Sequence, residues 1–258
     1  MKRLFQIELL KLKKNIAVMV IGIIYALVSI FIVFKSTGIK AFYNIETLQF
    51  PDIWLTATYV LGFLVIFPVI ISIINTTSEF SNKTSRQHII DGLSRNEFHL
   101  SKLISIFIIT SVFTMYLLLI CLILGFSNGG YTEFFGEEFS FVLGYFLYLF
   151  GVLCFVQIFC FLLKKTGLSL GLFLLYYLCI EPILFWSLLR SFSIKNYLPF
   201  EVFDSLLFSP FKDNSETIEK LQIPNITRYL EWQNVVVALC YIFIFIVITN
   251  TIFKKRDI

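Results

Sequence analysis

Charged residues are scarce in this chain, and so are glycine and proline. Only 15% of its 258 residues are Asp, Glu, Lys or Arg, whereas 58% are hydrophobic. Because soluble domains usually carry about 25% charged and about 45–50% apolar residues, this composition excludes an ordinary soluble domain. The low counts of Gly and Pro, 12 and 6, exclude a collagen-like or low-complexity chain. Apolar side chains are abundant, with 31 Phe among them, which indicates an integral membrane protein.

Motifs that carry enzymatic chemistry are missing as well. The sequence has no G-x-x-x-x-G-K-[ST] segment and therefore no P-loop for ATP. Residues 167–171 match the serine-nucleophile pattern G-x-S-x-G, but both His residues lie in the loop 78–102, so Ser169 has no base. The five Cys residues lie in apolar runs and indicate no disulfide framework. We expect no enzymatic activity, metal or cofactor on this chain, and no nucleic-acid partner.

Six stretches are long and apolar enough to cross a bilayer, which takes about 20 residues per helix. They are residues 16–34, 53–77, 103–126, 139–163, 168–189 and 232–253. Most Lys and Arg residues fall in the four connecting segments on one side, 1–15, 78–102, 164–167 and 254–258. Because positive charge marks the cytoplasmic side, we expect one transmembrane domain in the cytoplasmic membrane, with both termini in the cytoplasm.

The segment before the first span, residues 1–15, has the pattern of an amphipathic helix. Phe5, Leu9 and Leu12 fall on one face, and the opposite face carries Lys2, Gln6, Lys13 and Lys14. A basic helix of this kind is expected to lie in the membrane interface, with its lysines at anionic headgroups.

The longest cytoplasmic segment, residues 78–102, contains start and stop signals for a short helix over 84–91. In a capping box, a hydroxyl side chain and an acid or amide three residues later hydrogen-bond the free backbone N–H groups at the start of a helix. The segment has two such pairs, Thr84 with Gln87 and Ser94 with Glu97. Gly92 stands where a glycine commonly ends a helix. We therefore expect a capped helix outside the membrane, followed by a second helix that continues into the third span.

This segment also holds a set of short motifs: a Glu-aromatic pair, a Thr-x-Arg, a Ser-Arg and a small residue before Lys. They are Glu79-Phe80, Thr84 with Arg86, Ser94-Arg95 and Ser101-Lys102. The set resembles the ABC transporter permeases of the type-2 (exporter) family, in which Gly usually stands at the position of Ser101. The end of the chain, an aromatic residue followed by basic residues and Asp at 253–258, resembles that family as well.

The resemblance implies an all-α membrane protein with the type V exporter fold. This fold has an interfacial N-terminal helix, six transmembrane helices and two subunits around a central pathway. The helix 84–91 would be a coupling helix seated in a separate ATP-binding subunit, which holds ATP and Mg. Residues expected at that contact are Glu79, Thr84, Arg86, Gln87, His88, Arg95 and Lys102. Whether the second permease subunit is identical or a paralogue, and which substrate is moved, stays open.

Two polar residues lie inside predicted spans. An ionisable side chain in the membrane is costly, so Glu181 in the fifth span, followed by Pro182, indicates a function. Glu181 either faces a translocation pathway, bonds a neighbouring helix in its neutral form, or lies nearer the outer interface. Gln157 in the fourth span is a second pathway candidate, although helix–helix hydrogen bonding is typical of such a residue. The alternative function is a stand-alone secondary transporter or channel that uses Glu181.

The long segment on the outer side, residues 190–231, contains an apolar stretch at 199–211 that is too short to span a bilayer. We expect a short re-entrant helix there, which dips into the outer leaflet or covers the exit of the pathway.

Overall fold

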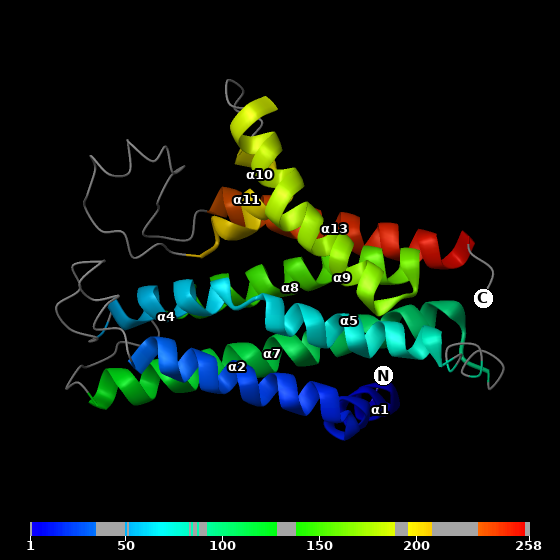
Figure 1. The fold of residues 1–258 in the computed structure, drawn as a ribbon, viewed down its shortest axis with the longest axis horizontal. Coiled ribbons are helices and arrows are strands. Elements are labelled where there is room, and N and C mark those ends of the chain that lie inside the picture. Colours follow the sequence, from blue (N-terminus) through cyan, green and yellow to red (C-terminus); the bar gives the residue numbers. More distant parts are fainter. Residues whose placement is uncertain are drawn as a thin grey trace.

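The computed structural model is an assembly of helices. It describes residues 2–34, 50, 52–82, 84, 87, 92–127, 138–188, 196–207 and 232–255, and this part of the chain contains no strand. In order, the helices are α1 (Lys2–Lys14), α2 (Ile16–Phe34), α4 (Asp52–Phe63), α5 (Ile66–Ser81), α7 (Arg95–Ser127), α8 (Glu138–Leu163), α9 (Thr166–Leu175), η1 (Tyr176–Ile180), α10 (Glu181–Ile183), η2 (Leu184–Leu188), α11 (Pro199–Asp204) and α13 (Trp232–Lys255). Most of the long helices run side by side along one axis (Figure 1). The all-α prediction is confirmed for these residues.

Helix length and hydropathy mark several membrane spans among the described residues. Four single helices qualify, at Arg95–Ser127, Phe139–Leu163, Thr166–Trp186 and Trp232–Lys255. Two bent pairs raise the number to as many as six if each contributes one span, and they are Leu4–Lys14 with Ile16–Ile32 and Ile53–Phe63 with Ile66–Ser81. The apolar stretches read from the sequence thus coincide with helices of the structure.

The first bend separates α1 from α2, and its cause is local. The Asn15 side chain accepts a hydrogen bond from the backbone N–H of Ala17 at 3.1 Å, which caps the start of α2. The two helices meet at 72°. The separate N-terminal helix is therefore confirmed. Phe5 and Leu9 of its apolar face are exposed, whereas Leu12 is buried together with the acidic Glu8. Its place in the membrane interface stays a prediction.

The second bend interrupts the stretch that the sequence predicted as one continuous helix over 53–77. Helices α4 and α5 meet at 46° around Leu64 and Val65. Pro68 lies four residues beyond Leu64, has no N–H to donate to that carbonyl, and its ring crowds the carbonyl. The hydroxyl of Tyr148 in α8 donates to the carbonyl of Gly62 at 3.3 Å, just before the break.

Helix α8 lies at the centre of the packing and contacts α4, α5, α7, α9, α11 and α13. Its inward side chains are almost fully buried, among them Leu149, Val152, Leu153 and Val156. Such close packing between apolar helices rests on shape complementarity, because lipid tails are as apolar as the side chains themselves. A residue on α8 can therefore couple the movements of several helices.

The fifth predicted span runs from α9 to η2 and leans away from the other helices (Figure 1). Two π-helical segments, η1 and η2, flank the single turn that contains Glu181 and Pro182. The missing N–H of Pro182 explains why the regular α-helical bonding is interrupted there. Beside this span lies α11, with Phe200, Val202 and Phe203 buried. The predicted short helix within 199–211 is thus present over Pro199–Asp204, while 208–211 lie outside the described residues.

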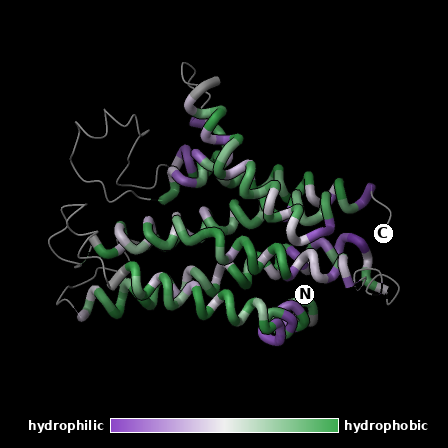
Figure 2. Tube along the Cα trace, viewed as in Figure 1, coloured by the Kyte–Doolittle hydropathy of each residue, from purple (hydrophilic) through white to green (hydrophobic). Residues whose placement is uncertain are grey.

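One end of the bundle gathers the segments predicted to face the cytoplasm. Helix α1, the first turn of α7, the connection between α8 and α9 and the last turn of α13 all lie there (Figure 1). Hydrophilic residues concentrate in α1 and at this end of the neighbouring helices (Figure 2). We call it the basic end, because the exposed lysines Lys13, Lys14, Lys254 and Lys255 belong to it.

Candidate functional site

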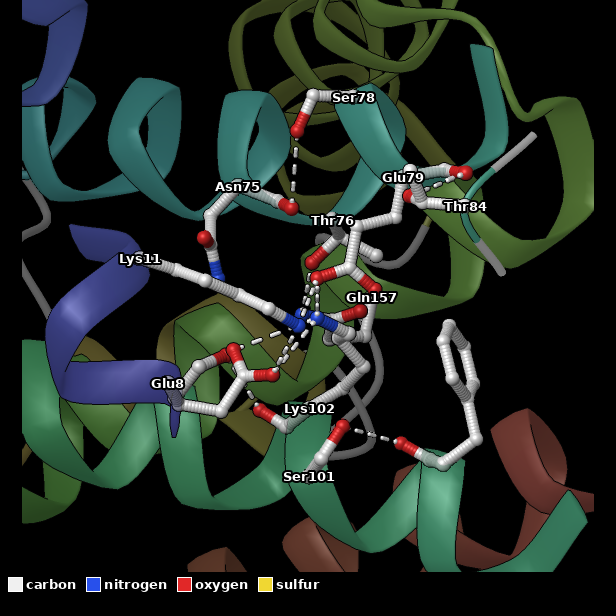
Figure 3. A network of polar contacts seen from close by, with 12 residues as sticks. Glu8, Lys11, Asn75, Thr76, Ser78, Glu79, Thr84, Ser101, Lys102 and Gln157 are labelled. Carbon is white, nitrogen blue, oxygen red and sulfur yellow. Dashed lines mark hydrogen bonds and ion pairs between the residues drawn. The ribbon is translucent and has the colours of Figure 1, made fainter. Parts of the chain in front are cut away.

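Four charged side chains from three helices meet at the basic end (Figure 3). Lys102 of α7 lies 2.6 Å from Glu79 of α5 and 3.3 Å from Glu8 of α1. Lys11, also of α1, lies 2.9 Å from Glu79 and 3.1 Å from Glu8. We call these four residues the ion-pair cluster, and it joins the N-terminal helix to the helices on both sides of the loop 82–94.

The ion-pair cluster is buried unevenly. The side chains of Lys102 and Glu8 are each 1% exposed, and that of Glu79 is 8% exposed. Lys11 is 30% exposed and closes the cluster toward the outside. Two carboxylates face two ammonium groups, so the formal charges balance. A buried pair contributes little net stability, but removing one partner strands a buried charge and costs about 3–5 kcal/mol.

Lys11 stays charged in this arrangement. Burial lowers the pKa of Lys11, but the neighbouring carboxylates of Glu79 and Glu8 outweigh this effect and raise the pKa above its usual value. Lys11 therefore remains a cation beside the two carboxylates at physiological pH.

A layer of polar side chains lies directly against the cluster. The Nε2 of Gln157 in α8 donates to the Thr76 hydroxyl of α5 at 2.9 Å. The Oε1 of Gln157, the Nδ2 of Asn75 and the Oε2 of Glu79 are buried and have no hydrogen-bond partner within the described part of the chain. The helix–helix bond expected of Gln157 is therefore observed, and its role in a pathway stays a prediction.

The loop after α5 is tied to the cluster through its backbone. The Thr84 hydroxyl donates to the carbonyl of Glu79 at 3.2 Å, which closes the end of α5. Gly92 has a φ of +99°, in the left-handed region that favours glycine. The helix predicted over 84–91, which Gly92 would end, lies mostly outside the described residues. The second capping box is confirmed, because the Glu97 carboxylate accepts from both the N–H and the hydroxyl of Ser94 at 2.8 Å.

Aromatic rings pack beside the charged side chains. Phe80 of α5, Phe98 of α7, Phe161 of α8 and Phe253 of α13 form an aromatic cluster at the basic end. The stacked Phe98 and Phe253 rings have centroids 5.1 Å apart, and the Phe80 and Phe161 centroids are separated by 5.6 Å. This packing joins the Glu-aromatic motif at 79–80 to the aromatic residue near the C-terminus, two features that lie far apart in the sequence.

Arg95 is bound within the chain. Its Nη1 donates to the carbonyl of Lys254 at 2.8 Å and so satisfies a terminal carbonyl of α13. The motifs singled out in the loop and at the C-terminus are therefore brought together by intramolecular contacts.

The residues predicted to contact an ATPase partner occupy three kinds of position. Glu79 and Lys102 are interior residues of the ion-pair cluster. Gln87 and Arg95 are exposed, and Thr84 is partly buried. Arg86 and His88 lie outside the described residues. Contact with a partner stays a prediction for the whole set.

Glu181 is buried and accepts hydrogen bonds from the start of α11. Its side chain is 3% exposed, and its Oε1 accepts the backbone N–H groups of Phe200 at 2.7 Å and Glu201 at 3.1 Å. The carboxyl group thereby caps the first turn of α11 from another helix. Of the alternatives for Glu181, bonding to a neighbouring helix is the one observed, and its role in a pathway stays a prediction.

Helix α11 is seated on α8 by a steric fit. The ring of Phe203 lies against Gly151, and any Cβ at position 151 would overlap it. Leu207 packs in the same manner against Gly62, at the end of α4. The two glycines thus allow α11 and the residues just after it to pack against the middle of α8 and the end of α4.

Sequence reasoning missed Glu8 and Gly151. Glu8 stands three residues before Lys11 in a basic segment, a local pairing that is visible in the sequence. Its burial against Lys102 depends on a partner 94 residues away. Gly151 lies in the middle of an apolar run, where the missing side chain is the only signal.

The long apolar helices, their parallel packing and the charged end define a multi-pass membrane protein. The chain belongs to the family described as "Protein of unknown function (DUF2705)", whose sequence profile matches residues 16–258. No curated protein matches the chain.

Proposed function

We propose that this protein is the membrane-spanning permease subunit of an ATP-driven exporter. In this proposal it has six spans, both termini are cytoplasmic, and it works with a second permease subunit and a separate ATP-binding subunit. The observation that supports the proposal is the ion-pair cluster, because it connects the loop expected to receive the ATPase to three helices of the membrane domain.

The cluster is suited to transmit movement of the loop. Glu79 is two residues from the end of α5. Its carbonyl accepts a hydrogen bond from the Thr84 hydroxyl, and its carboxylate accepts one from the Lys102 ammonium group. A displacement of the loop therefore pulls on α5 and α7 together. Lys11 and Glu8 extend the same connection to α1. Separating these charges in a buried setting is costly, so the three helices move as one body.

Helix α8 supplies a route from the ion-pair cluster to α11. Gln157 bonds α5 beside the ion-pair cluster, and Gly151 receives Phe203 of α11. Six residues separate these positions, which corresponds to about 9 Å along a helix. A shift of α8 driven from the basic end therefore changes the seat of α11. In the proposed cycle, loop movement loosens α11 and opens the outer side.

Co-purification tests the proposal directly. The tagged chain, solubilised gently from its native membrane, is expected to bring an ATP-binding subunit with it. In reconstituted membranes, the complex should hydrolyse ATP, and Lys102→Met should reduce transport more than it reduces complex formation. A chain that purifies without any ATP-binding protein, and transports in the absence of ATP, would contradict the proposal.

The second candidate function is a stand-alone secondary transporter or channel. The buried carboxyl group of Glu181 within a membrane span favours it, because such groups commonly serve ion coupling. If this candidate is right, liposomes that contain only the purified protein should show ion flux, and Glu181→Gln should abolish that flux.

A further inference from the structure

A groove opens at the basic end between the first turns of α7 and the last turns of α13. Its volume is about 300 Å³, and it is lined by Asn96, Glu97, His99, Leu100, Asn250 and Lys254. It lies apart from the ion-pair cluster and from α11. Residues of both helices therefore line one hollow at the level where the apolar part of α13 ends.

Three of the polar lining residues are already engaged or charged. The Glu97 carboxylate accepts the two hydrogen bonds from Ser94. The Nε2 of His99 lies 2.8 Å from the hydroxyl of Thr249, which fixes the imidazole against α13. Lys254 is exposed and brings one positive charge to the lining of the groove, while Arg95, which is not a lining residue, bonds the backbone carbonyl of Lys254.

Asn250 is a lining residue with an unsatisfied hydrogen-bond acceptor. Its Oδ1 is buried and has no hydrogen-bond partner within the described residues. A buried polar atom without a partner costs about 1–3 kcal/mol, so this position calls for a guest that donates a hydrogen bond. The exposed ammonium group of Lys254 suits a guest that also carries negative charge.

The wall of the groove continues as an apolar surface along α13. Phe243, Val247, Asn250 and Lys254 are spaced by four, three and four residues and therefore share one face of the helix. Phe243 is 68% exposed and Val247 is 44% exposed. Along this helix the hydrophobic residues give way to hydrophilic ones toward the basic end (Figure 2). The surface is thus polar at its end and apolar toward the membrane interior.

We propose that this groove binds the headgroup of one phospholipid from the adjoining leaflet. The lipid class is a glycerophospholipid whose headgroup combines a phosphate with a hydroxyl donor, as in phosphatidylglycerol. The phosphate pairs with Lys254, the headgroup hydroxyl donates to Asn250, and one acyl chain lies on Val247 and Phe243. The site requires membrane insertion only and does not depend on ATP-driven transport.

Native mass spectrometry of the full-length protein tests the site. The purified chain is exchanged into detergent that contains equal amounts of phosphatidylglycerol and phosphatidylcholine, whose choline headgroup offers no hydrogen-bond donor. The wild-type protein is expected to retain phosphatidylglycerol about tenfold better, the factor that one hydrogen bond to a charged or polar group contributes. Asn250→Leu removes the acceptor for the headgroup hydroxyl, and Lys254→Gln removes the cation that favours the net negative charge of phosphatidylglycerol over the zwitterionic phosphatidylcholine. Each substitution should therefore lower this preference.

The matched control is Lys255→Gln, which removes a neighbouring exposed lysine that does not line the groove. This variant should keep the preference, and Lys254→Arg should keep it as well, which shows that the charge rather than folding is responsible. Equal retention of both lipids by the wild-type protein would overturn the proposal. An equal loss of the lipid preference in Lys254→Gln and Lys255→Gln would also overturn it. Displacement of the lipid by millimolar inorganic phosphate would overturn it as well, because that result indicates an anion site only.

Discussion

Lys102 is the residue of the ion-pair cluster whose loss should cost most. It contacts both carboxylates, at 2.6 Å for Glu79 and 3.3 Å for Glu8, and its side chain is 1% exposed. Lys102→Met keeps a long side chain but removes its charge, so the two carboxylates of Glu8 and Glu79 then share the single cation Lys11. Breaking a buried pair in this manner costs about 3–5 kcal/mol. For a protein of this size each kcal/mol lowers Tm by about 2–4 °C, so a decrease of roughly 6–20 °C is expected.

Two further variants separate this effect from general damage to the core. Lys11→Met should lower Tm much less, because Lys11 is 30% exposed and its partners gain access to water when it is removed. The double variant Glu79→Gln with Lys102→Met removes one charge of each sign. It leaves Glu8 paired with Lys11, and it should recover a large part of the lost stability.

The assay is thermal unfolding of the detergent-purified protein, followed by circular dichroism, with all variants in the same detergent and pH. The reasoning is refuted if Lys102→Met melts within about 2 °C of the wild-type protein, less than the effect of one kcal/mol. It is also refuted if the double variant is as unstable as the sum of its two single variants, because the charges would then act independently.

Three further predictions concern Gly151, Glu181 and Gly92 and use the same melting assay. Gly151→Ala places a methyl group against Phe203 and should cost about 1–3 kcal/mol, whereas Gly171→Ala, with open space around it, should be neutral or stabilising. Glu181→Leu removes the cap of α11 and should cost about 0.5–2 kcal/mol, while Glu181→Gln keeps an oxygen acceptor and should cost less; equal losses would contradict the capping role. Gly92→Ala at φ +99° should cost about 1 kcal/mol or more, and an unchanged Tm would contradict the left-handed conformation.

Features with local causes were predicted well from the sequence. The apolar run 16–34 became α2 with the same bounds, and Ser94 with Glu97 formed the expected capping box. In each case the determining residues lie within a few positions of one another. Pro68 was also visible, but an apolar run that continues through a proline is read as one span by hydropathy alone, so the bend between α4 and α5 was missed.

Features that depend on distant partners were not predicted. Burial of Glu8 is possible only because Lys102 supplies its counter-charge from another helix, and no local pattern encodes that meeting. For Glu181, the composition of the span indicated a costly carboxylate, but its partners are backbone N–H groups of Phe200 and Glu201, which any sequence would possess. Side-chain patterns contain no information about such a cap.

The ion-pair cluster has a consequence for biosynthesis. Glu8 and Lys11 are synthesised before Glu79 and Lys102, from which two further membrane segments separate them. Until Glu79 and Lys102 are made, Lys11, three residues after Glu8, is the nearby counter-ion of Glu8, so α1 can stay at the membrane surface with this charge locally neutralised. Helix α1 can therefore reach its final buried contacts only after the start of α7 has been synthesised.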